Sequence, residues 1–167
     1  MRSPGRLLVF VFGSLAVLAL AGCSSGTATS SPTPAGASPA GGSPAAGQTV
    51  DVTLQEWAVV PASESVAAGD VSFAVTNNGP EDVHEFVVLK TDLDAGDLPT
   101  DDTGAVDEAG EGIETVVDEI EDIPVGESQD LSVVLDAGHY VLLCNIYDET
   151  EQEAHHALGM RTNFTVE

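Results

Sequence analysis

The chain has 167 residues, and 43% of them are hydrophobic, which is enough for one folded domain of ordinary size. Only 4 residues are Lys or Arg, against 28 that are Asp or Glu, and the formal net charge is −24. This balance excludes nucleic-acid binding through a basic face and electrostatic docking on anionic lipid.

The N-terminal segment is typical of an export signal. Arg2 and Arg6 precede an apolar run over residues 7–21, which is shorter than the roughly 20 residues of a spanning helix. The sequence Leu20-Ala21-Gly22-Cys23 then resembles the lipobox of bacterial lipoproteins, in which a cysteine becomes lipidated. We therefore expect a lipoprotein signal peptide over 1–22 and a chain anchored at Cys23 to the outer face of the cell membrane, in contact with the membrane through this lipid only. An ordinary signal peptide followed by an unrelated cysteine is the alternative.

A linker is predicted to follow Cys23. Every residue from 24 to 47 is Ser, Thr, Gly, Ala or Pro. Such a segment has too little apolar surface to offset the entropy of ordering it. We expect a lipid-anchored flexible linker over 23–47 and a folded domain over 48–167.

The predicted domain is built from short strands. Val50, Val52 and Leu54 alternate with polar residues, as do Val71, Phe73 and Val75. Further apolar runs lie at 85–89, 131–135, 140–146 and 164–166, and turn sequences such as Asn77-Asn78-Gly79-Pro80 separate them. About seven strands in this length predict an all-β fold, an antiparallel β-sandwich. Trp57 is interpreted as an anchor in the core or at the end of a sheet.

An acidic segment interrupts the strand pattern. Thirteen of the 33 residues from 90 to 122 are Asp or Glu. Within it, residues 111–120 place Ile113, Val116, Val117 and Ile120 at helical spacing, which predicts a short helix. We interpret 90–122 as a solvated insertion; a calcium loop is the alternative, although the spacing of an EF-hand is absent.

Four side chains suited to copper lie at predicted strand ends. His84 follows a turn, Cys144 ends the run that starts at Tyr140, and His155, His156 and Met160 precede the last strand. A type 1 copper site needs two imidazoles and a thiolate around the ion, with a weak thioether on the axis. The residues therefore predict one type 1 copper ion held by His84, Cys144, one of the two adjacent histidines, and Met160.

Three motifs carry a resemblance to the cupredoxins of the plastocyanin and azurin kind. The segment 138–146 resembles their penultimate strand, with Tyr140 at the place of the tyrosine corner. Residues 155–161 resemble the closing His-x-x-x-Gly-Met motif, and 78–88 resemble the stretch that supplies the first histidine. The resemblance covers nearly all of 48–167 and implies a Greek-key β-sandwich with His84, Cys144, His155 and Met160 as ligands.

Two features depart from the family pattern. Ten residues separate Cys144 from His155, where the family usually has two to four, and residues 148–153 are expected to bulge outward. The acidic insertion is expected to project from an edge of the sandwich. His155 is favoured over His156 because it fits the closing motif, which would leave His156 near the solvent edge of the site. His139 is interpreted as a turn residue.

The resemblance implies a single-electron carrier that serves redox donor and acceptor proteins outside the cytoplasm as a monomer. Four protein ligands leave no open copper position, so we expect no enzymatic activity. A copper-handling protein that stores or delivers the ion, and a metal-free β-sandwich that acts as a binding module, are the alternatives.

Overall fold

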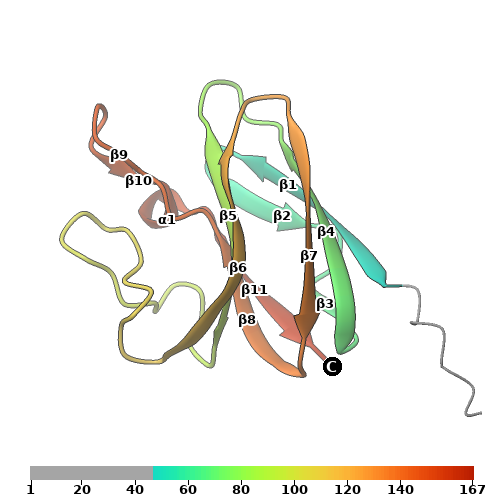
Figure 1. Cartoon of the computed structure of the whole chain (residues 1–167). Coiled ribbons are helices and arrows are strands. Elements are labelled where there is room, and N and C mark those ends of the chain that lie inside the picture. The colour runs from blue at the N-terminus through green and yellow to red at the C-terminus, as the bar shows by residue number, and fades with distance from the viewer. Residues whose placement is uncertain (1–46) are drawn as a thin grey trace, which may run out of the picture. The chain divides into compact units, whose positions relative to one another are not determined.

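Two β-sheets form most of the described part of the chain, residues 47–167 of a computed structural model (Figure 1). The first sheet has the strand order β2-β1-β4-β7 and the second the order β3-β11-β8-β5-β6. The predicted signal peptide, Cys23 and all of the predicted linker except Gly47 lie outside the described residues. The strands of the first sheet are β1 (Gln48–Gln55), β2 (Ala58–Pro61), β4 (Gly69–Asn77) and β7 (Ser128–Leu135). Those of the second are β3 (Ser65–Val66), β5 (His84–Thr91), β6 (Ile113–Ile123), β8 (Gly138–Leu143) and β11 (Arg161–Val166).

The expected fold class is confirmed, with one difference in strand direction. Most neighbouring strands are antiparallel, but β1 pairs with β4 in parallel and β11 pairs with β3 in parallel. The sheets are therefore mixed. A two-stranded pair, β9 (Tyr147–Asp148) and β10 (Glu153–Ala154), and the short helix α1 (His155–Leu158) lie between β8 and β11.

The main core fills the space between the two sheets. Phe73 of β4, Phe86 of β5 and Phe164 of β11 are fully buried there, and the ring of Phe73 lies 5.3 Å from that of Phe86 and 5.7 Å from that of Phe164. The alternation read from the sequence is present, because Val71, Phe73 and Val75 all face this core. Tyr140 forms the predicted tyrosine corner, and its hydroxyl donates a hydrogen bond to the Asp136 carbonyl at 2.9 Å.

The predicted helix over 111–120 is wrong. Residues 113–123 form strand β6, which pairs with β5 along its length. The register of this pairing shifts at three places, so the apolar residues of β6 do not keep a period of two. An irregular strand produced the helix-like spacing, and pairing with β5 decided the conformation.

The acidic insertion is not simply a solvated projection. Its apolar residues Ala95, Leu98 and Val106 are buried against Val87, Leu89, Val141 and Leu143, which form the outer face of β5 and β8. Figure 1 shows this yellow segment beside the second sheet, on the side away from β4 and β7. Residues 92–112 therefore cover a second core, and the expected projection from a sheet edge is wrong.

Within the described residues, no helix has the length and hydrophobicity that crossing a membrane requires. The only helix there, α1, has four residues.

Candidate metal centre

Neighbouring strands bring the first two candidate ligands together. His84 is the first residue of β5, and Cys144 directly follows β8. These strands are antiparallel neighbours, with Val87 opposite Leu143, so the start of β5 and the end of β8 meet at the same end of the sheet. His155 comes back to this end at the start of α1, where its N–H donates a hydrogen bond to the Ile146 carbonyl at 2.9 Å.

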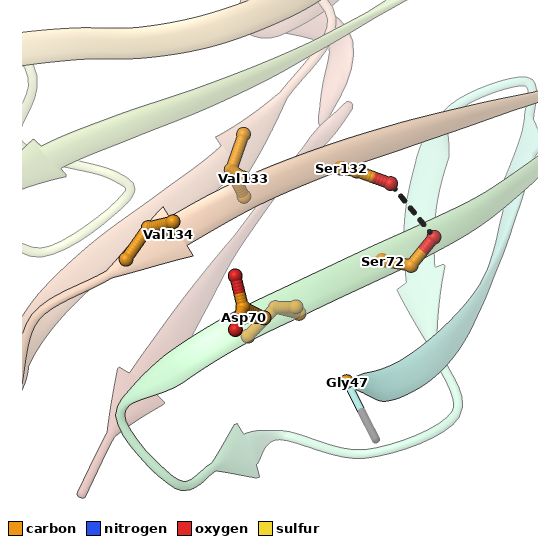
Figure 2. Close-up of a pocket in the computed structure, with 7 residues that line it drawn as sticks. Gly47, Asp70, Ser72, Ser132, Val133 and Val134 are labelled. Carbon is orange, nitrogen blue, oxygen red and sulfur yellow. Dashed lines mark hydrogen bonds between the residues drawn. The ribbon is translucent and has the colours of Figure 1, made fainter. Parts of the chain in front are cut away.

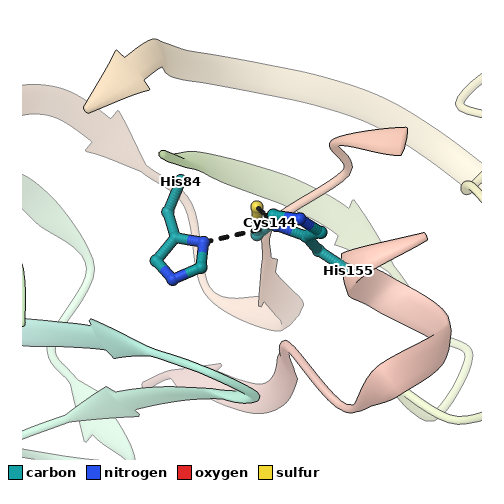
Figure 3. Close-up of side chains that lie close together, drawn as sticks. All are labelled: His84, Cys144 and His155. Atoms are coloured by element: carbon teal, nitrogen blue, oxygen red, sulfur yellow. Dashed lines mark hydrogen bonds between the residues drawn. The ribbon is translucent and has the colours of Figure 1, made fainter. Parts of the chain in front are cut away.

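Figure 3 shows the three side chains converging on one point. Nδ1 of His84 lies 3.3 Å from Nδ1 of His155, and the Cys144 Sγ lies 3.5 Å from that same nitrogen. Each of the three residues has one candidate ligand atom within 4.8 Å of the others. His84 and Cys144 are completely buried and His155 is 2% exposed. One metal ion could therefore contact all three.

Met160 lies at the same end of the sandwich. It is completely buried in the main core together with Cys144, and its carbonyl accepts a hydrogen bond from the Cys144 N–H at 3.0 Å. Its own N–H donates to the His155 carbonyl at 3.1 Å. The backbone thus ties the methionine to both neighbouring candidate ligands.

The two adjacent histidines point in different directions. His155 joins His84 and Cys144, whereas Nε2 of His156 lies 3.3 Å from the carbonyl oxygen of Ala95 in the insertion. His156 is only 4% exposed, so its expected place near the solvent edge is wrong. Residues 92–112 cover it, and that packing was not visible in the sequence.

Burial determines the protonation of the cluster. Burial raises the pKa of the Cys144 thiol to about 12. A hydrogen bond from the Glu85 N–H to the sulfur, at 3.2 Å, acts in the opposite direction and lowers this pKa, but burial has the larger effect. Burial lowers the pKa of His84, with a further contribution from the charge of His155, and burial likewise lowers the pKa of His155. Neutral imidazoles have a free lone pair for a metal, and a metal that binds this thiol must displace its proton.

Glu56 is a site residue that the sequence analysis missed. It lies just after β1, and its Oε1 atom is 3.8 Å from Nε2 of His84. Burial favours the neutral acid, but hydrogen bonds from the Asp82 and Glu81 backbone outweigh it and lower the pKa of Glu56. Nothing in the sequence near Glu56 distinguishes it from the many other acidic residues.

Trp57 packs at the edge of the site. Its ring lies 5.0 Å from the His155 ring in an edge-on arrangement, and it is partly buried against the main core. This position agrees with the expected anchor at the end of a sheet.

The interpretation of His139 as a turn residue is wrong, because it lies in β8 with Nδ1 at 2.8 Å from the Thr91 carbonyl oxygen.

The insertion contacts the chain on both sides of the long loop. Asn145, next to Cys144, accepts a hydrogen bond from the Val106 N–H at 2.6 Å and donates to the Val106 carbonyl at 3.1 Å and to Glu108 at 2.9 Å. At the other end of the loop, His156 contacts Ala95. The expected bulge of 148–153 is present as the turn between β9 and β10. The two ends of the loop, next to Cys144 and next to His155, are held in place by the insertion.

Acidic residues surround the opening beside His155. A cleft of about 330 Å³ is lined by His155 together with Glu81, Asp82, Val83, Asp122, Ile146 and Asp148. Nearby, burial and the charges of Glu119 and Glu108 raise the pKa of Glu85 to about 7. The surface around the candidate site is therefore strongly negative.

A separate hollow lies on the first sheet and has no set of metal-binding side chains. It measures about 170 Å³ and is lined by Gly47 and residues of β4 and β7, where the Ser132 hydroxyl donates to the Ser72 oxygen at 3.3 Å (Figure 2). Asp70 is the single titratable residue in its lining. We assign no chemistry to it.

Comparison with known proteins identifies the fold. No protein-family model and no curated protein matches the sequence. Among solved structures, dithionite-reduced auracyanin from the photosynthetic bacterium Roseiflexus castenholzii is similar with a TM-score of 0.53 and 20% identity, over 74% of this chain and 99% of that chain. The chain has the cupredoxin fold.

Two other solved structures are similar at lower scores. The azurin Az-iso2 from Methylomonas sp. strain J has a TM-score of 0.49 and 18% identity, over 73% of this chain and 99% of that chain. Auracyanin A from Chloroflexus aurantiacus has a TM-score of 0.48 and 16% identity, over 71% of this chain and 98% of that chain. Within its cupredoxin fold, the present chain gathers His84, Cys144 and His155 at one end of the sandwich.

Proposed function

We propose that this protein binds one type 1 copper ion and carries single electrons between redox proteins outside the cytoplasm. The observation that carries the proposal is the convergence of two imidazoles and one thiol, all buried, within 4.8 Å of one another. A copper ion in such a donor set supplies a centre that cycles between Cu(I) and Cu(II). The similarity to an auracyanin structure described as reduced supports this function.

In the proposed site each residue has a distinct role. The copper ion would be held by Nδ1 of His84, Sγ of Cys144, Nδ1 of His155 and the thioether of Met160. The Glu85 N–H, 3.2 Å from the Cys144 sulfur, stabilises the thiolate once the thiol proton is lost. Trp57 and the surrounding core exclude water from the ligands. A full set of protein ligands leaves no position for a substrate, which favours a carrier over an enzyme.

The cellular placement belongs to the same proposal. A signal peptide over 1–22, a lipid on Cys23 and a flexible linker over 23–47 would tether the domain 48–167 to the outer face of the membrane. Its partners would be redox donor and acceptor proteins, met by a monomer. The acidic cleft beside His155 suits a partner with a basic face.

One spectrum separates this function from its alternatives. Copper-loaded full-length protein should show intense visible absorption from sulfur-to-copper charge transfer, and this absorption should vanish and return on reduction and reoxidation. A protein that takes up copper without this absorption would be a copper-handling protein instead. A protein that takes up no copper would be a metal-free binding module.

A further inference from the structure

We propose that Glu56 is a positioning residue that accepts a hydrogen bond from Nε2 of His84 and thereby favours the oxidised state of the bound metal. This inference rests on the proposed copper site. It concerns a carboxylate that is remote in sequence from all four candidate ligands.

Backbone hydrogen bonds hold the Glu56 side chain in place. It is only 12% exposed, and Oε1 accepts hydrogen bonds from the Asp82 N–H at 2.9 Å and the Glu81 N–H at 3.3 Å. These two residues lie in the turn that leads directly into His84. A Cβ atom at Gly79 would lie 2.6 Å from Oε1, so the absence of a side chain at Gly79 leaves the space for the carboxylate.

Two buried atoms in this region lack a hydrogen-bond partner among the described residues. They are Nε2 of His84 and Oε2 of Glu56. Because Nδ1 of His84 faces Cys144 and His155, a metal bound there requires the imidazole proton to be on Nε2. The Nε2–H group then points into a buried region where the Glu56 carboxylate is 3.8 Å away.

A small adjustment completes the contact. The distance of 3.8 Å is roughly 0.6 Å beyond the upper limit of an N–H···O hydrogen bond. Closing it would give a partner to Nε2 of His84, which removes the cost of leaving this buried donor unpaired. Histidines that bind metals commonly donate their other ring N–H to a carboxylate, and this bond fixes the tautomer and the ring orientation.

The carboxylate would also act through its charge. A negative group beside a ligand makes the imidazole a stronger donor and favours the more positive ion, Cu(II). The effect persists because this region is buried and therefore poorly screened by salt. Removing the charge should accordingly raise the reduction potential of the site.

The test compares two Glu→Gln variants of the copper-loaded full-length protein by voltammetry. Glu56→Gln should keep the visible absorption and raise the potential by at least 59 mV, which is a tenfold shift in the preference for Cu(I) over Cu(II). Glu64→Gln removes the same charge from an exposed residue next to β3, near the far end of β11, and should change the potential much less. Equal potentials for the two variants, both coloured, would overturn the role of Glu56.

A second pair of measurements does not depend on the folding of Glu56→Gln. Gly79→Ala keeps the charge but pushes the carboxylate away, and it should raise the potential in the same direction. In the wild-type protein loaded with Cu(I), imidazole 1H–15N spectra should show a slowly exchanging proton on Nε2 of His84. A rapidly exchanging Nε2 proton would overturn the proposal. Absence of colour in the wild type would refute the copper site itself, which is a separate outcome.

Discussion

At the scale of single residues, Cys144 is the side chain on which the proposed site depends most. It is completely buried, and burial raises the pKa of its thiol to about 12, so only a bound metal would keep it as a thiolate at neutral pH. Cys144→Ser should therefore abolish the charge-transfer absorption of the copper-loaded protein. Cys23→Ser should keep the colour and release the protein from the membrane. A coloured Cys144→Ser variant would contradict the assignment.

The adjacent histidines offer a matched pair of variants. His155 faces the cluster, whereas His156 faces Ala95. His155→Gly should lose the visible absorption, and added imidazole should restore it by filling the space that the side chain leaves. His156→Gly should keep the absorption, because its ring does not face the site, but it should lower the stability of the fold. Absorption spectra with and without imidazole distinguish the two, and the reverse pattern would assign the ligand to His156.

Tyr140 tests the tyrosine corner. Its hydroxyl donates to the Asp136 carbonyl at 2.9 Å, and the side chain is almost completely buried. Tyr140→Phe should lower the free energy of unfolding by about 1 kcal/mol, because the bond is lost and a carbonyl loses its partner. Tyr147→Phe is the control, since the Tyr147 hydroxyl has no hydrogen-bond partner in the part of the chain that the structure describes. Chemical denaturation measures both, and equal losses would argue against the corner.

At the scale of elements, residues 92–112 join the second core to the metal-binding end. The segment packs Ala95, Leu98 and Val106 onto β5 and β8, and it binds Asn145 next to the candidate ligand Cys144. An insertion that looked like a solvated run of acidic residues therefore shapes the site. It compensates for the unusually long loop between Cys144 and His155 by holding both of its ends.

Asn145 tests this role of the insertion. Asn145→Ala removes three hydrogen bonds, two of them to Val106, and leaves backbone groups of the insertion unpaired. We expect a loss of about 1–3 kcal/mol in unfolding free energy and faster release of copper to a chelator. Asn78→Ala, at an exposed position in the turn after β4, should change neither quantity appreciably. Unchanged stability and copper release in Asn145→Ala would show that the insertion does not hold the loop.

At the scale of the whole molecule, charge governs encounters with partners. Loss of residues 1–22 would leave Lys90 and Arg161 as the only strong bases against 28 acidic residues. Added salt should stabilise the fold by screening this self-repulsion over about 10 Å at 0.1 M.

Electron transfer with a cationic redox reagent should slow steeply as ionic strength rises, while transfer with an anionic reagent should accelerate. Stopped-flow measurements give both rates. Rates independent of salt would contradict electrostatic steering of a basic partner and would leave adaptation to a saline habitat as the explanation of the acidic charge.

The sequence by itself determined the fold class and the kinds of ligand. Alternation at Val71, Phe73 and Val75 marks one buried sheet face, because successive side chains of a strand point to opposite faces. The candidate donors His84 and Cys144 could be named from their residue types and their positions at strand ends, because type 1 copper requires that combination. His155 is favoured over His156 only by its fit to the closing motif of the cupredoxins. Local patterns suffice where a feature depends on neighbouring residues of the same strand.

Only the tertiary structure decided the rest. Residues 113–120 have helical spacing, yet they form β6 because pairing with β5 satisfies their backbone over a shifting register. His155 faces the site and His156 faces Ala95 because the insertion packs over α1 from a distance of about sixty residues in sequence, as the contact between Ala95 and His156 shows. The contact between Glu56 and His84 is also a long-range one. The Glu56 carboxylate lies beside His84 and accepts a hydrogen bond from the Asp82 N–H, in the turn that precedes His84. These contacts join segments far apart in the chain, and no local pattern of residue types specifies which distant groups will meet when the sheets pack.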